Sequence, residues 1–305
     1  MSELNKIAIQ ILSGGKGILA ADESTATMSK RLESVNVTSN EESRLLFRKT
    51  LFSSESMKSC IGGVILYDET IKQRNELKSI PELINDSNTV TGIKVDTGAK
   101  ILAGSNEEKI TEGLDGLRER LKEYYKFGAR FTKWRGVYKI SKKHPSKLSI
   151  HSNAHALARY AALVQECGMV PIIEPELLMD GNHSAEICFE KSLEVIKKCF
   201  EELILHKTDL SGVILKPNMI LDGASVEKKI SSEQVADLTL KCLKNAVPQE
   251  VPGIAFLSGG QTEIEATENL NLINKKNNTK FIMTFSYGRA LQQSALKHWS
   301  KNIND

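Results

Sequence analysis

Short apolar runs rich in β-branched residues alternate along this chain with longer amphipathic stretches. Several runs, such as GVILY and GVILKP, are apolar at consecutive positions, which is typical of strands buried on both faces of a parallel sheet. The pattern predicts eight strands: Ile18–Asp22, Gly63–Tyr67, Thr91–Asp96, Arg130–Arg135, Val170–Glu176, Gly212–Pro217, Gly253–Ser258 and Phe281–Ser286. It predicts helices over Thr25–Glu33, Glu41–Ser53, Glu107–Phe127, Ile150–Glu166, Glu186–Leu205, Ser232–Lys244, Thr262–Ile273 and Gly288–Trp299.

Regular alternation of strands and helices favours an α/β fold, and eight such units favour a closed (β/α)8 TIM barrel. A doubly wound sheet is the alternative, but it usually carries a GxGxxG turn after its first strand. Here the first strand leads into Asp-Glu-Ser-Thr. Without a linker or an internal repeat, residues 1–305 are predicted to form a single barrel domain.

Charged and polar residues recur where the predicted strands end. The carboxyl ends of all barrel strands meet at one face, so these residues are expected to surround one mouth. A single lysine in a strand is more often a paired structural residue than a catalytic one. Several together are harder to explain that way, because burying charge is costly. The set comprises Asp22, Lys94, Lys133, Arg135, Glu174, Glu176, Lys216, Ser258 and Ser286.

The lysines and carboxylates of this set suit Schiff-base chemistry. Neighbouring cations and a partly dry site favour a neutral amine, which can attack a carbonyl carbon. A nearby carboxylate can then move protons between the carbinolamine, water and the iminium. We choose Lys216 as the nucleophile because it follows an apolar run and precedes Pro217, with Lys133 as the second cation. Residue chemistry alone does not rank the two lysines firmly.

Glycine-rich turns after the last two strands predict a phosphate site. Glycines let backbone N–H groups approach an anion, and helix N-termini attract negative charge. Simple helix capping is the alternative for the glycines taken alone. A second anion site is predicted across the mouth, so that a substrate with a phosphate at each end would fit. The first site would use Ser258, Gly259, Gly260, Gly288 and Arg289, and the second Ser24, Thr27 and Lys94.

Composition narrows the function classes. A net charge of +3 with scattered charges argues against a nucleic-acid partner. No apolar run reaches the roughly 20 residues of a membrane span. Five widely spaced cysteines and the lack of a secretory signal favour a cytoplasmic protein. His151 and His155 have the spacing of a metal-binding pair on a helix, but a third ligand is not evident nearby, so we expect no metal.

Motifs across nearly the whole chain resemble class I fructose-1,6-bisphosphate aldolase, the metal-independent Schiff-base family of glycolysis. They are GKGILAADEST (15–25), CIGGVIL (60–66), GIKVD (92–96), KWR (133–135), VPIIEPE (170–176), VILKPNM (213–219), FLSGGQ (256–261) and TFSYGRALQQSALKHW (284–299).

The resemblance implies a role for each matched residue. Lys216 would form the Schiff base, Glu174 would act as acid and base on the carbinolamine, and Asp22 would handle the C4 hydroxyl proton. Lys133 would polarise the same region. Arg135 and Glu176 would support the site. The C1 phosphate would bind Ser258, Gly259, Gly288 and Arg289, with Gly260 and Ser286 beside them, and the C6 phosphate would bind Ser24, Thr27 and Lys94.

The implied activity is that of a lyase without a cofactor: reversible cleavage of fructose 1,6-bisphosphate into dihydroxyacetone phosphate and glyceraldehyde 3-phosphate. The resemblance also suggests a homotetramer. The family usually continues into a tail ending in tyrosine, whereas this chain ends at Asp305. We expect that proton exchange on the enamine is slow or uses another group, or that the sequence is a shortened form. Two alternatives stay open: preference for fructose 1-phosphate or sedoheptulose 1,7-bisphosphate, and a catalytically idle scaffold.

Overall fold

The computed structural model describes residues 1–303, and its centre is a closed barrel of parallel strands. Around the ring the strands follow the order β1-β10-β9-β8-β7-β6-β3-β2. The alternating pattern of the sequence therefore predicted the fold class correctly. The barrel strands are β1 (Gly17–Ala21), β2 (Ile61–Leu66), β3 (Val90–Lys94), β6 (Phe131–Tyr138), β7 (Val170–Leu177), β8 (Ile214–Leu215), β9 (Gly253–Phe256) and β10 (Ile282–Tyr287).

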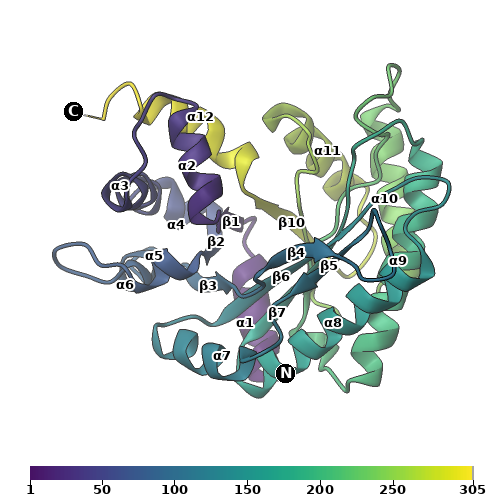
Figure 1. The fold of residues 1–305 in the computed structure, drawn as a ribbon, viewed down its shortest axis with the longest axis horizontal. Coiled ribbons are helices and arrows are strands. Elements are labelled where there is room, and N and C mark those ends of the chain that lie inside the picture. The colour runs from purple at the N-terminus through teal and green to yellow at the C-terminus, as the bar shows by residue number, and fades with distance from the viewer. Residues whose placement is uncertain (304–305) are drawn as a thin grey trace.

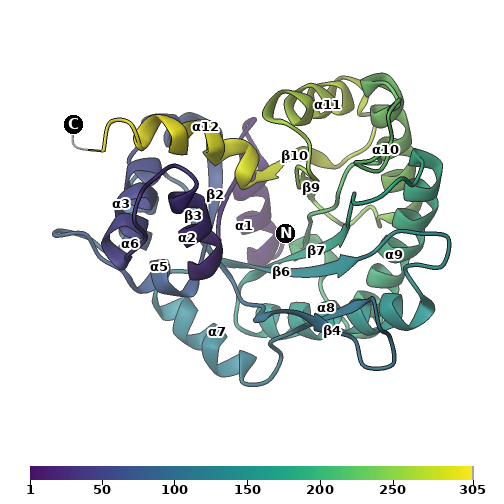
Figure 2. The ribbon, with the colours of Figure 1, turned by 45° about the horizontal axis from the view of Figure 1, so that its top comes forward.

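Helices surround the barrel, as Figures 1 and 2 show. Most begin at a serine, threonine or asparagine whose side chain accepts a hydrogen bond from the first turn, for example Ser231 before α10 and Thr262 before α11. Within the described residues no helix has both the length and the apolarity to cross a membrane. The larger helices are α1 (Glu3–Leu12), α2 (Thr25–Glu33), α3 (Glu41–Phe52), α7 (Leu117–Lys126), α8 (Lys147–Glu166), α9 (Ala185–Leu205), α10 (Ser232–Ala246), α11 (Glu263–Lys276) and α12 (Arg289–Trp299). Shorter ones are α4 (Ser56–Cys60), α5 (Asp68–Lys72) and α6 (Ile80–Asn85).

The helix predicted over Glu107–Phe127 is wrong in its first half. That segment contains β5 (Lys109–Glu112), which pairs with β4 (Gly98–Ile101) in a two-stranded antiparallel sheet. Thr111 is held there by tertiary bonds, since its Oγ1 donates to the Arg135 carbonyl at 2.6 Å. Gly116 has a φ of +65°, a left-handed conformation, and α7 begins only after this residue.

Helix α1, which the strand-and-helix pattern did not predict, closes the barrel at the amino ends of its strands. Its residues Ala8, Ile11 and Leu12 join one apolar cluster with side chains from the barrel interior. The approach is close: a Cβ on Gly62 would lie 2.0 Å from the carbonyl oxygen of Ile11. Helix α1 therefore covers this end, and the cavity described below opens at the carboxyl ends of the strands. The interior members are Ile18, Ala20, Ile65, Phe131, Ile172, Ile214 and Ala255.

Strand β8 is shorter than the predicted Gly212–Pro217. A 3-10 turn over Leu210–Gly212 occupies its start, and only Ile214–Leu215 pair as a strand. Lys216 still continues the ladder, since its N–H donates to the Ile173 carbonyl at 2.8 Å, and the Pro217 carbonyl accepts from Leu257 at 3.0 Å. These two bonds fix the backbone of Lys216 at the rim of the barrel.

Candidate active site

A cavity of about 450 Å³ opens at the carboxyl ends of the strands, and every predicted site residue lines it. The residues come from most of the barrel strands and from the helix starts that follow β1 and β10. The expectation that one mouth gathers them is therefore confirmed as geometry. They are Asp22, Ser24, Thr27, Lys94, Lys133, Arg135, Glu174, Glu176, Lys216, Ser258, Gly259, Gly260, Ser286, Gly288 and Arg289.

The Glu174 carboxylate lies between two lysines at the base of this cavity. Its Oε1 is 2.9 Å from Lys216 Nζ, and its Oε2 is 3.1 Å from Lys133 Nζ. Lys133 Nζ also lies 2.6 Å from Asp22 Oδ2. The side chains of both lysines and of Glu174 are 5% exposed, so the pairs are shielded from water and strong. Amine and carboxylate are thus positioned to exchange a proton directly.

The charges of these groups are set by one another. Burial alone would raise the pKa of Asp22, but the Lys133 and Lys216 ammonium groups lower it to about 2. Burial likewise opposes ionisation of Glu174, yet Lys133 and Lys216 hold its pKa below the ordinary value. Burial alone would lower the pKa of Lys133, but the Asp22 and Glu174 carboxylates raise it. Asp22 and Glu174 are therefore anions at neutral pH, and Lys133 is a fixed cation.

A second group of charges forms the neighbouring wall. Asp96 Oδ1 lies 3.0 Å from Lys94 Nζ, and its Oδ2 accepts from the Arg135 backbone at 3.3 Å. The Arg135 guanidinium pairs with Glu176. Burial alone would lower the pKa of Arg135, but its hydrogen bond to Glu176 raises it. Asp96 and Glu176 thus hold two cations in place at the rim of the cavity.

The start of α2 forms one end of the cavity. Ser24 is its N-cap, and the Ser24 and Thr27 hydroxyl oxygens lie 3.1 Å apart. Two further lining residues, Glu23 and Arg31, were not predicted from the sequence; they pair with each other there. The signal for Arg31 was its spacing of four residues from Thr27, which places both on one face of a helix.

The turns after β9 and β10 form the other end of the cavity. Gly259 and Gly260 have φ values of +58° and +82°, a left-handed conformation that only glycine adopts without strain and that lets backbone N–H groups turn toward an anion. Gly288 caps α12 without a side-chain hydrogen bond, and Arg289 begins that helix. The buried Ser286 hydroxyl has no protein partner within the described residues. Amides, a hydroxyl and a guanidinium are therefore available to a phosphate.

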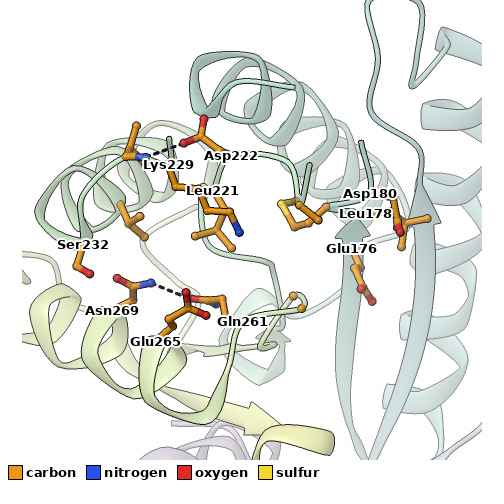
Figure 3. A pocket seen from close by; sticks show the side chains of 16 residues that line it. Glu176, Leu178, Asp180, Leu221, Asp222, Lys229, Ser232, Gln261, Glu265 and Asn269 are labelled. Carbon is orange, nitrogen blue, oxygen red and sulfur yellow. Dashed lines mark hydrogen bonds between the residues drawn. The ribbon is translucent and has the colours of Figure 1, made fainter. Parts of the chain in front are cut away.

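A second cavity, of about 260 Å³, shares Glu176, Gly259 and Gly260 with this mouth. Figure 3 shows the side chains that line it. Two of its polar side chains, Asp222 and Gln261, are bonded within the protein. Asp222 accepts from the Ile230 backbone at 2.7 Å, and Gln261 accepts from Asn269 at 2.7 Å (Figure 3). Groups fixed in this way hold loops together, whereas the main cavity brings the Lys216 amine within 2.9 Å of the Glu174 carboxylate. We therefore place the chemistry in the main cavity.

The donor atoms of the main cavity suit an anionic organic substrate better than a metal. The carboxylate oxygens of Asp22 and Glu174 are already in contact with ammonium groups. Among the described residues, a cluster with ligand spacing occurs instead at His155, Glu202 and His206, outside the cavity. The arrangement of the mouth is an amine beside a carboxylate, with the start of α2 and the turns after β9 and β10 lining the same cavity.

Comparison with known proteins identifies the family. The sequence profile described as "Fructose-bisphosphate aldolase class-I" matches residues 3–304. The chain belongs to the class-I fructose-bisphosphate aldolase family. This class-I aldolase is 46% identical over 305 residues to a probable fructose-bisphosphate aldolase class 1 of Xanthomonas campestris pv. campestris, covering 99% of the chain and 91% of the relative. It is 49% identical to fructose-bisphosphate aldolase C of Carassius auratus, covering 97% and 83%.

The structure of this aldolase agrees with the same family. It matches a co-crystal structure of fructose-bisphosphate aldolase from Plasmodium falciparum with a TM-score of 0.97 and 44% identity, covering 99% of this chain and 88% of that one. The protein is accordingly a lyase that cleaves fructose 1,6-bisphosphate reversibly into dihydroxyacetone phosphate and glyceraldehyde 3-phosphate, by the Schiff-base mechanism characteristic of the family.

Proposed function

We propose that Lys216 is the Schiff-base lysine of this aldolase and that Glu174 is its acid and base. The observation that supports this assignment is the 2.9 Å contact between Lys216 Nζ and Glu174 Oε1 in a buried site. Glu174 takes a proton from the ammonium group, which leaves a neutral amine to attack the C2 carbonyl carbon of the open-chain ketose. The same carboxyl group then protonates the carbinolamine hydroxyl, which departs as water to leave the iminium.

Asp22 is proposed to start carbon–carbon cleavage. Its carboxylate accepts the C4 hydroxyl proton, the C3–C4 bond breaks, and the electron pair moves into the iminium to give an enamine. Glyceraldehyde 3-phosphate leaves at this point. Protonation of the enamine at C3 and hydrolysis of the iminium release dihydroxyacetone phosphate and regenerate Lys216. Lys133, 2.6 Å from Asp22, keeps that carboxylate ionised and orients it.

The two anion-binding ends of the cavity are proposed to hold the two phosphates. Ser258, Gly259, Gly288 and Arg289 would bind the C1 phosphate, with Gly260 and Ser286 completing the surface. Ser24, Thr27 and Lys94 would bind the C6 phosphate, and so would Arg31, which lines the same cavity. Arg135 and Glu176 support the wall between them. Sites at both ends favour fructose 1,6-bisphosphate over ketose monophosphates.

We also propose that the enzyme is a cytoplasmic homotetramer. Aliphatic side chains that are more than half exposed, such as Leu77 and Ile101, supply apolar surface for subunit contacts. One relative, 48% identical over 299 residues and covering 97% of this chain and 76% of the relative, is named fructose-bisphosphate aldolase 4, cytosolic, from Arabidopsis thaliana. Light scattering on the purified protein tests the stoichiometry, since a tetramer of this 33.8 kDa chain is readily separated from a monomer or dimer.

Substitution of the nucleophile tests the assignment of Lys216. Lys216→Met removes the amine but keeps a flexible side chain of similar length, so we expect cleavage of fructose 1,6-bisphosphate to fall to background while the circular dichroism spectrum is kept. Lys244→Met, in an exposed position on α10, is the matched control and should retain wild-type turnover. Wild-type-like turnover of Lys216→Met would remove this residue from the mechanism.

A further inference from the structure

Two neighbouring helices outside the barrel bring four potential metal ligands together. On α8, His151 and His155 are four residues apart and so share a face, and Glu202 on α9 has the same spacing from His206. The sequence predicts no metal for the first pair, because no third ligand lies near it in the chain. The fold supplies the missing ligands from the next helix, since α8 packs against α9.

The ligand atoms of this cluster are within reach of a single ion. One atom each from His155, Glu202 and His206 all lie within 4.8 Å of one another. His155 Nδ1 is 3.2 Å from Glu202 Oε2, and His151 Nδ1 is 3.5 Å from Glu202 Oε1. The Glu202 carboxylate is only 4% exposed, although Glu202 lies in the last turn of α9.

His206 is held in the tautomer that a metal requires. Its Nδ1 lies 2.8 Å from the Glu202 backbone carbonyl oxygen. A carbonyl oxygen can only accept, so Nδ1 carries the proton and the lone pair is on Nε2. Metal-binding histidines commonly use such a bond from their other nitrogen to orient the ring. The His155 and His206 rings lie edge to face, with centroids 5.0 Å apart.

We propose that His155, Glu202 and His206 bind one divalent transition-metal ion, with His151 in reach as a fourth ligand. Two or three imidazoles and one carboxylate form a donor set that suits Zn²⁺ and neighbouring metals, and not Ca²⁺ or Mg²⁺, which prefer oxygen. Binding of the metal ion would displace Lys198, whose Nζ lies 3.1 Å from Glu202 Oε1.

The proposed ion would be structural. His206 follows α9 at the end from which the chain enters β8, and Lys216 lies at the other end of that strand, so the cluster is on the side of the barrel away from the mouth. An ion held by both helices would tie α8 to α9 without contacting substrate. The proposal is independent of the roles assigned to Lys216 and Glu174, and it leaves the Schiff-base chemistry free of metal.

Titration of the full chain with Zn²⁺ tests the site, after treatment with EDTA and its removal. The background carries Cys60→Ser, because Cys60 is an exposed thiol that could bind zinc itself. Isothermal calorimetry should give one Zn²⁺ per chain. At a free concentration about 100 times Kd, we expect the melting temperature to rise on the order of 5 °C. Aldolase activity should be the same before and after zinc is added.

Variants of the proposed metal ligands test whether these residues bind the Zn²⁺ ion. His155→Gln and His206→Gln should each weaken Zn²⁺ binding at least about tenfold and abolish the rise in melting temperature. His298→Gln, an exposed histidine on α12, is the matched control and should bind as the parent does. Both ligand variants are expected to remain folded, which their aldolase activity checks. Absence of a one-to-one Zn²⁺ complex in the parent, or Zn²⁺ binding as tight as the parent's in either ligand variant, would overturn the proposal.

Discussion

Lys133 Nζ lies 2.6 Å from Asp22 Oδ2, and this ion pair joins the first strand of the barrel to β6. Both side chains are largely shielded from solvent, so water screens the attraction between the two charges only weakly. Its effect is to keep Asp22 ionised well into the acid range, with a pKa of about 2 against an ordinary value of 3.8. The carboxylate proposed to accept the C4 hydroxyl proton is therefore present as a base at any physiological pH.

This pairing makes a prediction about acid stability. The pKa of Asp22 is lower in the folded protein than in the unfolded chain, so its contribution is present above about pH 4 and is lost as the pH falls toward 2. From pH 5 to pH 3, the free energy of unfolding of the wild type should fall about 1 kcal/mol more than that of Asp22→Asn. Urea denaturation at the two pH values measures the difference, and equal falls would contradict the lowered pKa.

Asp22→Asn should also separate cleavage from Schiff-base formation. Its amide cannot accept the C4 hydroxyl proton, so turnover of fructose 1,6-bisphosphate should drop by roughly 10²–10⁴-fold. The amine of Lys216 and its partner Glu174 are untouched, so the variant should still form a borohydride-reducible adduct with dihydroxyacetone phosphate. Glu174→Gln is the comparison, because it should slow adduct formation itself. If Asp22→Asn lost adduct formation as completely as cleavage, its assigned role would be wrong.

Arg31 gives a prediction about the two ends of the substrate. It lines the cavity beside Ser24 and Thr27, the proposed site of the C6 phosphate. Arg31→Ala should raise the KM for fructose 1,6-bisphosphate by about 10–100-fold, the loss expected for a charged hydrogen bond. Fructose 1-phosphate lacks that phosphate and should be cleaved as before, whereas Arg289→Ala should impair both substrates. An equal rise in the KM for both substrates in Arg31→Ala would contradict the assignment of Arg31 to the C6 phosphate.

The barrel could be predicted from the sequence because its signals are local. Strands such as Val170–Glu176 are continuous apolar runs, and polar residues at their ends mark the mouth. Once a barrel is assumed, its geometry brings Lys133, Glu174 and Lys216 together without further information. That is why the main cavity contains every residue predicted for it.

The remaining features depend on contacts between distant segments. Strand β5 exists because Thr111 bonds to Arg135 and Asn153, and these bonds override the helical pattern of the surrounding residues. Helix α1 covers the amino ends of the barrel strands, and this position follows from the close contact between Ile11 and Gly62, which are distant in the sequence. The His155–Glu202 contact joins two residues that are 47 positions apart and lie on different helices, a relationship that no spacing within either helix reveals.

Reductive trapping tests the central claim most directly. The protein is incubated with dihydroxyacetone phosphate in the presence of EDTA, reduced with borohydride, and analysed by intact mass and peptide mapping. We expect one triose phosphate per chain, attached to Lys216, and no adduct in Lys216→Met. An adduct on Lys133, or no adduct from the folded wild-type protein, would contradict the assignment. A requirement for added zinc would contradict a reaction carried by lysine and carboxylate alone.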